Sequence, residues 1–300
     1  MRPAFYQITS FFNMTRTPYK SFAVVGANGT IGKPVVQNLL AQNASVLILT
    51  RPSSTAEFPS GAKVVHVEYS DESVVASALR ENGVEVVVST VGFQGFGSQK
   101  PLATAAKAAG VKLFVPSEFG MPTEGATEGH LVHKSNFAAT LREMGLPSLR
   151  VYNGLFMHFI PMIAAVPETG KFLILGEGKT PASFTAAEDI GGFLAHVLTT
   201  LPPRKLHNAV FRIEGQRSTM LEISELYSGR NHVERVESIP SDVPLYQVRQ
   251  NLQSQFELGA CSTGWDPAKG KELEGDEAAG SANVHWKGHQ WKTVKEVLSL

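Results

Sequence analysis

A glycine-rich turn near the start of the chain carries the clearest chemistry in this sequence. Residues 26–32 read Gly-Ala-Asn-Gly-Thr-Ile-Gly, after an apolar run at 22–26 and at the start of a helical pattern at 30–42. Glycine permits a tight turn of positive φ and a close backbone approach to a ligand, and the free N–H groups of a helix N-terminus attract phosphate. The turn therefore predicts a dinucleotide site whose residues are Gly26, Asn28, Gly29, Thr30, Ile31 and Gly32.

The residues after the next apolar run, 45–50, indicate which dinucleotide binds. A site for NAD would place Asp or Glu there to bind the ribose hydroxyls, but this chain has Arg51 and no acid before Glu57. A guanidinium binds a 2′-phosphate through two hydrogen bonds, so Arg51 favours NADP(H), with a solvated surface arginine as the alternative. Lys33 is a second candidate for a phosphate contact.

One lysine lies on the apolar side of an expected helix at 127–144. Its neighbours at −3, +3, +4 and +7 are Leu131, Phe137, Ala138 and Leu141. Lysine is seldom buried without a partner, although its stem can also follow an apolar face out to water. Because this helix follows the turn at residues 117–118, we expect Lys134 near a bound nicotinamide, where a lowered pKa would suit proton transfer.

To act together, these residues need a fold that places the ends of several strands next to one another. Runs typical of buried strands alternate with helical patterns over about 130 residues, which predicts βαβ units, a parallel sheet and helices on both faces. The expected strands are 22–26, 45–50, 63–67, 85–90, 111–116 and 147–152, and the expected helices are 30–42, 71–82, 99–109 and 127–144. Ligands of such sheets bind outside the carboxyl ends of the strands. Further candidates for cofactor contacts at those ends are Thr90, Val91, Gly92, Ser117, Glu118 and Phe119.

The alternation stops after residue 153. Strands are expected at 171–175 and 208–213, helices at 185–200, from 219 onward and near 291–300, and a surface loop at 259–282. We therefore expect a doubly wound α/β domain of the Rossmann type at 21–155. Residues 156–300 are expected to form a smaller lobe with elements that return to that domain, and residues 1–20 a disordered leader. A basic, acid-poor leader also fits a mitochondrial presequence, but three interruptions by Pro3, Asn13 and Pro18 favour the first interpretation.

Composition excludes several classes of protein. Lys+Arg and Asp+Glu are 27 each, and this balance argues against nucleic acid or an anionic membrane surface as the partner. Cys261 is the single cysteine, which fits a reducing, cytoplasmic setting. No apolar run reaches a membrane span, and the histidines lack the spacing of metal ligands. The expected partners are a small-molecule substrate and, as a candidate, a second copy of the chain.

Taken together, these motifs resemble the isoflavone-reductase-like and NmrA-like branch of the atypical short-chain dehydrogenases. The resemblance runs from about residue 22 to the C-terminus. It is strongest in the glycine turn, in Val-Pro-Ser-Glu-Phe-Gly at 115–120, in the Lys134 helix and in the stretch 183–191. It implies a Rossmann domain with a C-terminal substrate lobe, NADPH as cofactor, Lys134 as the catalytic lysine, and Asn153 and Phe156 at the nicotinamide end.

The chain departs from the common short-chain dehydrogenases in its proton donor. Those enzymes have tyrosine four residues before the lysine, where this chain has His130. His130 could donate the proton or simply contribute to helix packing. We expect an NADPH-dependent reductase of small aromatic or phenylpropanoid-like substrates. The alternatives are a non-catalytic NADP(H)-sensing regulator on the same fold and, less favoured, an epimerase or dehydratase of the extended group.

Overall fold

The computed structural model describes residues 17–127, 129 and 131–300, and this part of the chain divides into two compact units. Unit 1 consists of the described residues up to Glu118 together with His133–Arg150 and Gly191–Val210. Unit 2 consists of the described residues of Phe119–Val132 together with Val151–Ile190 and Phe211–Leu300. Residues 1–16 of the predicted leader lie outside the described residues, and so does His130.

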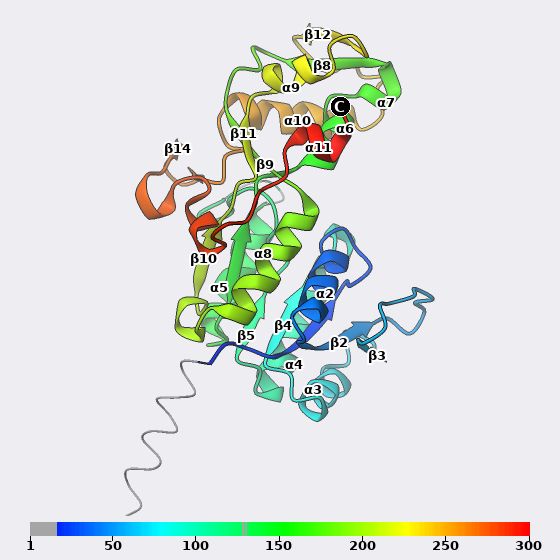
Figure 1. Cartoon of the computed structure of the whole chain (residues 1–300), viewed down its shortest axis with the longest axis vertical. Helices are drawn as coiled ribbons and strands as arrows, with labels where there is room; N and C mark the ends of the chain where they lie inside the picture. Colours follow the sequence, from blue (N-terminus) through cyan, green and yellow to red (C-terminus); the bar gives the residue numbers. More distant parts are fainter. Residues whose placement is uncertain (1–16, 128, 130) are drawn as a thin grey trace, which may run out of the picture. The chain divides into compact units, whose positions relative to one another are not determined.

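Unit 1 is built on a parallel sheet of five strands in the order β3-β2-β1-β4-β5 (Figure 1). The strands are β1 (Ser21–Val25), β2 (Ser45–Thr50), β3 (Lys63–His66), β4 (Val86–Ser89) and β5 (Leu113–Val115). The chain runs outward from β1 to β3 and then returns to place β4 on the other side of β1. The carboxyl ends of β1 and β4 therefore form a topological switch point, which is where such sheets bind ligands.

Helices cover both faces of this sheet. The unit 1 helices are α2 (Gly32–Ala41), η1 (Phe93–Ser98), α3 (Glu72–Glu81), α4 (Gln99–Ala109) and η3 (Pro203–Lys205). One face buries Ala23, Leu47 and Val87 in a core cluster that contains residues of α3, α4 and helix α5 (Leu131–Glu143). On the other face α2 lies against Gly191 of helix α8 (Ala187–Thr200), where an added Cβ would come within 2.7 Å of Pro34. This arrangement confirms the α/β fold predicted from the alternation of strands and helices.

Four elements pass from one unit to the other. They are α5 (Leu131–Glu143), β6 (Leu149–Tyr152), α8 (Ala187–Thr200) and β10 (Ala209–Arg212). β6 and β10 pair with each other, and the residues before β6 extend the sheet of unit 1, because Phe114 N–H donates to the carbonyl of Pro147 at 2.9 Å.

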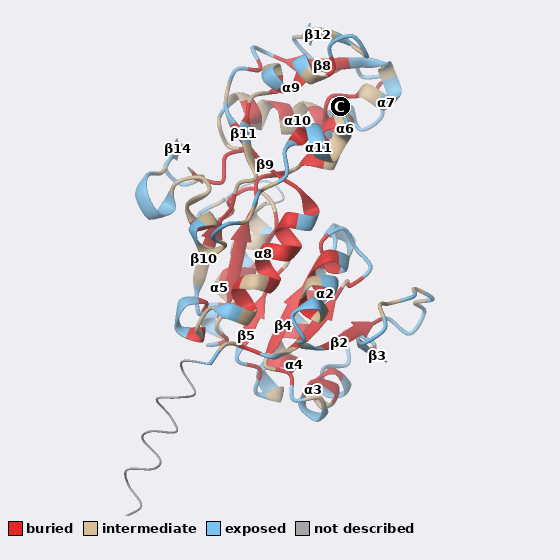
Figure 2. Cartoon of the chain, in the orientation of Figure 1, coloured by how far each residue is buried: buried red, intermediate tan, exposed pale blue. Residues whose placement is uncertain are grey.

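Local signals in the sequence account for several helix ends. Asp71 caps α3 by accepting a hydrogen bond from Val74 N–H at 3.1 Å, and Gly110 ends α4 in the left-handed conformation at φ 81°. Strands β1, β2, β4 and β5 are buried along most of their length (Figure 2), whereas β3, at the edge of the sheet, is exposed or only partly buried.

The N-terminal boundary of unit 1 differs from the expectation. Tyr19 is only 3% exposed and its hydroxyl lies 2.6 Å from Nε2 of His207, while Lys20 N–H donates to the Glu85 carboxylate at 2.9 Å. These residues fall within the segment predicted as a leader, whose polar and aromatic residues have no periodic pattern that would reveal such contacts. Burial, and to a lesser degree Glu85, raises the pKa of the Tyr19 phenol.

Unit 2 combines short strands with short helices. Its strands are β7 (Leu155–Phe156), β8 (Lys171–Leu175), β9 (Ala182–Thr185), β11 (Gln216–Ser218), β12 (His232–Val236), β13 (Trp265–Asp266) and β14 (Lys271–Glu272). Its helices are η2 (Met157–Phe159), α6 (Ile160–Ile163), α7 (Val166–Thr169), α9 (Met220–Leu226), α10 (Tyr246–Glu257), η4 (Gly275–Glu277), η5 (Ser281–His285) and α11 (Val294–Leu298). β9 pairs antiparallel with β11 and parallel with β7, and β8 pairs with β12 in parallel.

The prediction of a surface loop at 259–282 is wrong for the first part of this segment. Cys261, Ser262 and Thr263 are fully buried. Ser183 of β9 holds this segment, because its N–H donates to Cys261 O at 3.1 Å and its hydroxyl accepts from Thr263 N–H at 2.9 Å. Composition alone does not reveal a loop whose backbone is satisfied by buried partners. Among the helices of the described residues, none is long and apolar enough to cross a membrane.

Candidate functional site

The glycine turn of unit 1 is built so tightly that side chains would not fit at two of its positions. Gly26 has φ 82°, and a Cβ added there would lie 2.8 Å from the carbonyl oxygen of Thr90. A Cβ on Gly32 would lie 2.2 Å from Gly26 O, whereas one on Gly29 would lie 3.2 Å from that oxygen. The predicted turn therefore brings strand β1, helix α2 and the end of β4 into direct backbone contact.

This turn presents backbone groups at the start of α2. Asn28, Gly29 and Thr30 are exposed, Ile31 is buried, and the first turn of α2 contains no acidic residue. No side chain of the described residues caps this helix. A helix N-terminus without a cap or a nearby carboxylate favours an anion, because its N–H groups and the helix dipole both point toward negative charge.

Arg51 directly follows β2 and begins a turn closed by the hydrogen bond from Ser54 N–H to Arg51 O at 3.0 Å. Its side chain is exposed, as is that of Lys33 in the first turn of α2. Burial raises the pKa of the neighbouring Tyr69, and the positive charge of Arg51 opposes part of that increase. An exposed guanidinium beside this strand end is accessible to a phosphate group.

The turn after β4 is tied to the glycine turn. The hydroxyl of Thr90 donates to Val25 O at 2.8 Å and to Gly26 O at 3.1 Å. Val91 is half-buried and Gly92 is exposed. Thr90 thus fixes the spacing of the two strand ends at the switch point, and Gly92 leaves the adjacent backbone open.

The turn after β5 joins the same network. The hydroxyl of Ser117 donates to Val91 O at 2.7 Å, and the Glu118 carbonyl accepts from Nζ of Lys134 at 3.1 Å. Glu118 is 1% exposed. Burial lowers the pKa of Lys134, and the Glu118 carboxylate opposes part of that shift. Lys134 is thus a partly buried lysine whose ammonium is held by a backbone carbonyl, an environment that suits it to gain or lose a proton.

Three further predicted residues belong to unit 2. Phe119 is buried, and Phe156 meets His158 and Phe159 edge to face. Asn153 is fully buried: its N–H donates to Gly120 O at 3.0 Å, and its carbonyl accepts from the hydroxyl of Thr185 at 2.8 Å. Among the described residues, its side-chain oxygen has no hydrogen-bond partner.

Unit 2 also contains a cavity of about 690 Å³. Its wall is mainly apolar and includes Met121, Leu131, Leu252 and Trp265, while Asn251 and Gln255 contribute side-chain amides. A size of this order and a few polar groups in an apolar wall are typical of small-molecule sites. The sequence did not predict this cavity, because helix α10, which forms much of it, was not predicted.

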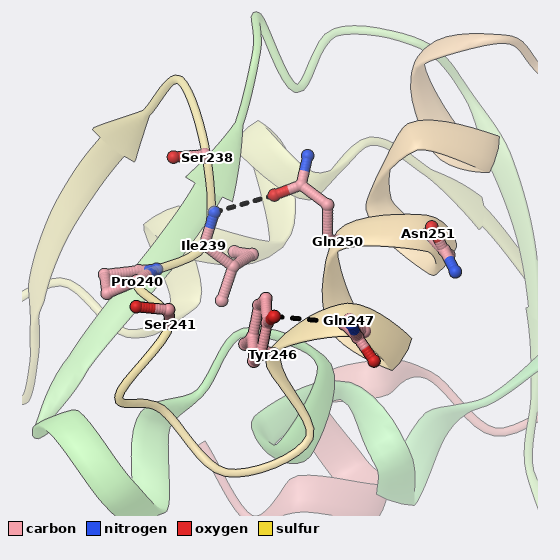
Figure 3. Close-up of a pocket in the computed structure, with 8 residues that line it drawn as sticks. All are labelled: Ser238, Ile239, Pro240, Ser241, Tyr246, Gln247, Gln250 and Asn251. Atoms are coloured by element: carbon pink, nitrogen blue, oxygen red, sulfur yellow. Dashed lines mark hydrogen bonds between the residues drawn. The ribbon is translucent and has the colours of Figure 1, made fainter.

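A second hollow of about 530 Å³ lies beside it on unit 2 (Figure 3). Residues 238–241 and the first turns of α10 line it, and Oε1 of Gln250 accepts from Ile239 N–H at 2.7 Å. Its lining mixes apolar and polar uncharged residues, and none of the residues predicted from the sequence belongs to it.

The structure thus gathers most, though not all, of the predicted residues. Hydrogen bonds connect the ends of β1, β4 and β5 with Lys134 inside unit 1, whereas Phe119, Asn153 and Phe156 belong to unit 2. His130 lies outside the described residues. Sequence reasoning missed Gln99, a buried residue at the start of α4 whose side chain accepts from Ser117 N–H at 2.7 Å, because one polar residue at a helix start gives no pattern.

Comparison with known proteins adds an independent observation. The model of the NmrA-like family matches residues 18–296. Pinoresinol reductase 1 of Arabidopsis thaliana is 30% identical over 242 residues, which are 71% of this chain and 74% of that protein. Asnovolin J 5′,6′-dehydrogenase of Aspergillus novofumigatus is 28% identical over 252 residues, covering 77% of this chain and 72% of the relative.

Solved structures share the fold. The complex of leucoanthocyanidin reductase with NADPH from Vitis vinifera aligns with a TM-score of 0.74 at 23% identity, covering 93% of this chain and 98% of that chain. An isoflavone reductase aligns with a TM-score of 0.75 at 21% identity and the same coverage.

Proposed function

The chain belongs to the NmrA-like family, and from this premise we propose that it is an NADPH-dependent reductase of small aromatic, phenylpropanoid-like compounds. The resemblance predicted from the motifs is thereby confirmed. The observation that carries the proposal is the bonded group in unit 1 that connects the glycine turn, through Thr90 and Ser117, with the Lys134 ammonium.

The residues of unit 1 fit a bound dinucleotide phosphate. A pyrophosphate needs close backbone approach, and this turn offers it, because it packs so closely that Cβ atoms at Gly26 or Gly32 would collide with the backbone of Thr90 or Gly26. The Gly29 N–H donates within the turn, to Gly26 O at 2.9 Å, so the neighbouring amides would hold the pyrophosphate. The exposed Arg51 would hold the 2′-phosphate. When bound, NADPH supplies a hydride to the substrate.

Lys134 has the properties of the group that completes the reduction. A substrate that accepts a hydride also needs a proton, and Nζ of Lys134 carries one whose release is eased by burial. The Glu118 carbonyl fixes the direction of this ammonium. A proton lost from Nζ is replaced from water, either directly or through the predicted relay residue His130.

The cavity of unit 2 supports an aromatic substrate. The Trp265 indole offers a flat apolar surface and Leu252 adds further apolar contact, while the amides of Asn251 and Gln255 offer hydrogen bonds to phenol, methoxyl or ether oxygens. A relative from Ginkgo biloba is named phenylcoumaran benzylic ether reductase, a name that specifies an ether of an aromatic compound. A cytoplasmic location and a homodimer stay predictions from the sequence.

The test combines cofactor titration with a substrate panel. We expect the protein to bind NADPH and to consume it with at least one aromatic enone or benzylic ether. Trp265→Ala should raise KM for that compound roughly tenfold, the scale of losing a buried aromatic contact. Tyr246→Ala, in the hollow of Figure 3, is the matched control and should leave KM unchanged. Tight NADPH binding without consumption by any compound would instead favour the NADP(H)-sensing regulator.

A further inference from the structure

Gln99 is a fully buried glutamine whose side-chain amide is hydrogen-bonded through its oxygen but not through its nitrogen. Its Oε1 accepts from Ser117 N–H at 2.7 Å, and among the described residues its Nε2 has no hydrogen-bond partner. The backbone donor fixes the orientation of the amide, because exchanging its oxygen and nitrogen would set two donors against each other. A buried donor without a partner reduces stability.

Gln253 in unit 2 shows how this protein otherwise buries a glutamine. Its Oε1 accepts from Leu175 N–H at 2.8 Å, and its Nε2 donates to Ile163 O and Leu173 O at 2.9 and 3.2 Å. The amide of Gln253 is therefore satisfied at both ends. Gln99 differs, so a contribution to stability alone does not explain its side chain.

The side-chain hydrogen bond from Ser117 N–H to Gln99 is the first in a short series that ends at the lysine. It holds the amide of Ser117, whose hydroxyl is held in turn by Val91 O. The next residue in that turn is Glu118, whose carbonyl accepts from Nζ of Lys134. Every member of this series lies in unit 1.

We propose that Gln99 is a positioning residue for the reduction proposed above: it fixes the turn of Ser117 and Glu118 and, through that turn, the ammonium of Lys134. The catalytic role of this positioning rests on the proposed function. The positioning itself follows from the hydrogen bonds of unit 1. The charged group that faces Lys134 from the turn is the Glu118 carboxylate, and the exposed His133 is its neighbour on α5.

The test measures Lys134 directly and needs no substrate. The full-length protein is labelled with acetic anhydride over a range of pH, and acylation of each lysine is read from peptide mass spectra. In Gln99→Leu we expect the acylation midpoint of Lys134 to rise by about one pH unit, because a relaxed turn admits water and burial is the main cause of its lowered pKa. Gln253→Leu is the matched control and should lower the melting temperature without moving that midpoint.

Kinetics supply the second readout. Gln99→Leu should lower kcat at least about tenfold, since small displacements of a catalytic group have large effects, while the dissociation constant for NADPH stays unchanged. An unchanged Lys134 midpoint in a folded Gln99→Leu protein overturns the proposal, whatever happens to its melting temperature.

Two arms keep the outcomes distinct. If Gln99→Leu does not fold, Ser117→Ala decides, because it removes the separate bond to Val91 from the same turn: a raised midpoint supports positioning and an unchanged one refutes it. If the wild-type protein consumes NADPH with no compound, the proposed reductase fails, yet the labelling result still shows whether Gln99 positions Lys134.

Discussion

Substituting Gly32 by alanine tests the glycine turn at its tightest point. The added Cβ would lie 2.2 Å from Gly26 O and 2.7 Å from Oγ1 of Thr90. Ordinary contacts between carbon and oxygen are about 3.3 Å or longer, so the turn or the helix must move by roughly 1 Å. Overpacking of this kind costs about 1–3 kcal/mol, which corresponds to a fall in melting temperature of roughly 2–12 °C.

The same displacement should weaken cofactor binding. If the shifted helix loses one charge-assisted hydrogen bond to the pyrophosphate, about 1.5–3 kcal/mol is lost, or roughly a 10- to 150-fold increase in the dissociation constant for NADPH. Fluorescence titration measures this increase, and differential scanning calorimetry measures the stability. Comparison of the two separates a displaced turn from general unfolding.

Gly29→Ala is the matched control within the same turn. A Cβ there would lie 3.2 Å from Gly26 O, a contact that a shift of a few tenths of an ångström relieves. We expect this variant to bind NADPH within a small factor of wild type. Equal affinities for wild type, Gly29→Ala and Gly32→Ala would refute the reasoning that close backbone packing forms the phosphate site.

Four other predictions address the remaining parts of unit 1. Arg51→Ala should reduce the preference for NADPH over NADH by roughly 10- to 150-fold, and equal preferences in a titration of both cofactors would contradict its role. Lys134→Ala should lower turnover by about 100-fold or more with a much smaller effect on NADPH affinity. Burial lowers the pKa of Lys134, so its ammonium should lose its proton at a pH below the usual pKa range of lysine, and turnover should decline there. A turnover rate that stays constant up to the usual lysine range would be inconsistent with proton donation from Nζ. A chain that begins at Ser21 should lose about 2–3 kcal/mol relative to one that begins at Thr17, since it lacks the buried Tyr19 ring and its bond to His207; identical melting temperatures would show that the segment is dispensable.

The sequence predicted unit 1 well because its signals are local. Short apolar runs, the Asp71 cap and the Gly110 end need only neighbouring residues to be recognised. The strand order was not predicted in the same way, since the position of β4 next to β1 depends on contacts between distant segments. That order is what gives the glycine turn and Thr90 their shared position.

Unit 2 was predicted less well because polar residues build part of its interior. Helix α10 buries Arg249, Gln253 and Phe256, so its buried face has no continuous apolar pattern. Arg249 is satisfied by the Glu168 carboxylate at 2.6 Å and by Met162 O at 2.7 Å. A pattern of hydrophobic residues predicts the burial of apolar side chains. Hydrogen bonds that allow a polar side chain such as Arg249 to be buried are seen only in the folded structure.

Unsatisfied groups locate the candidate site independently of the family resemblance. Within the described part of the chain, the buried side-chain atoms without a partner are Ser89 Oγ, Gln99 Nε2 and Asn153 Oδ1. Ser89 directly precedes Thr90, Gln99 holds Ser117, and Asn153 is itself a predicted site residue. Natural proteins satisfy nearly all buried polar groups, and the exceptions concentrate where function competes with stability. The buried side chains of Arg249 and Gln253 do have hydrogen-bond partners. The three exceptions therefore stand out: Ser89 and Asn153 lie in segments that the motifs had singled out on chemical grounds, and Gln99 is bonded to such a segment.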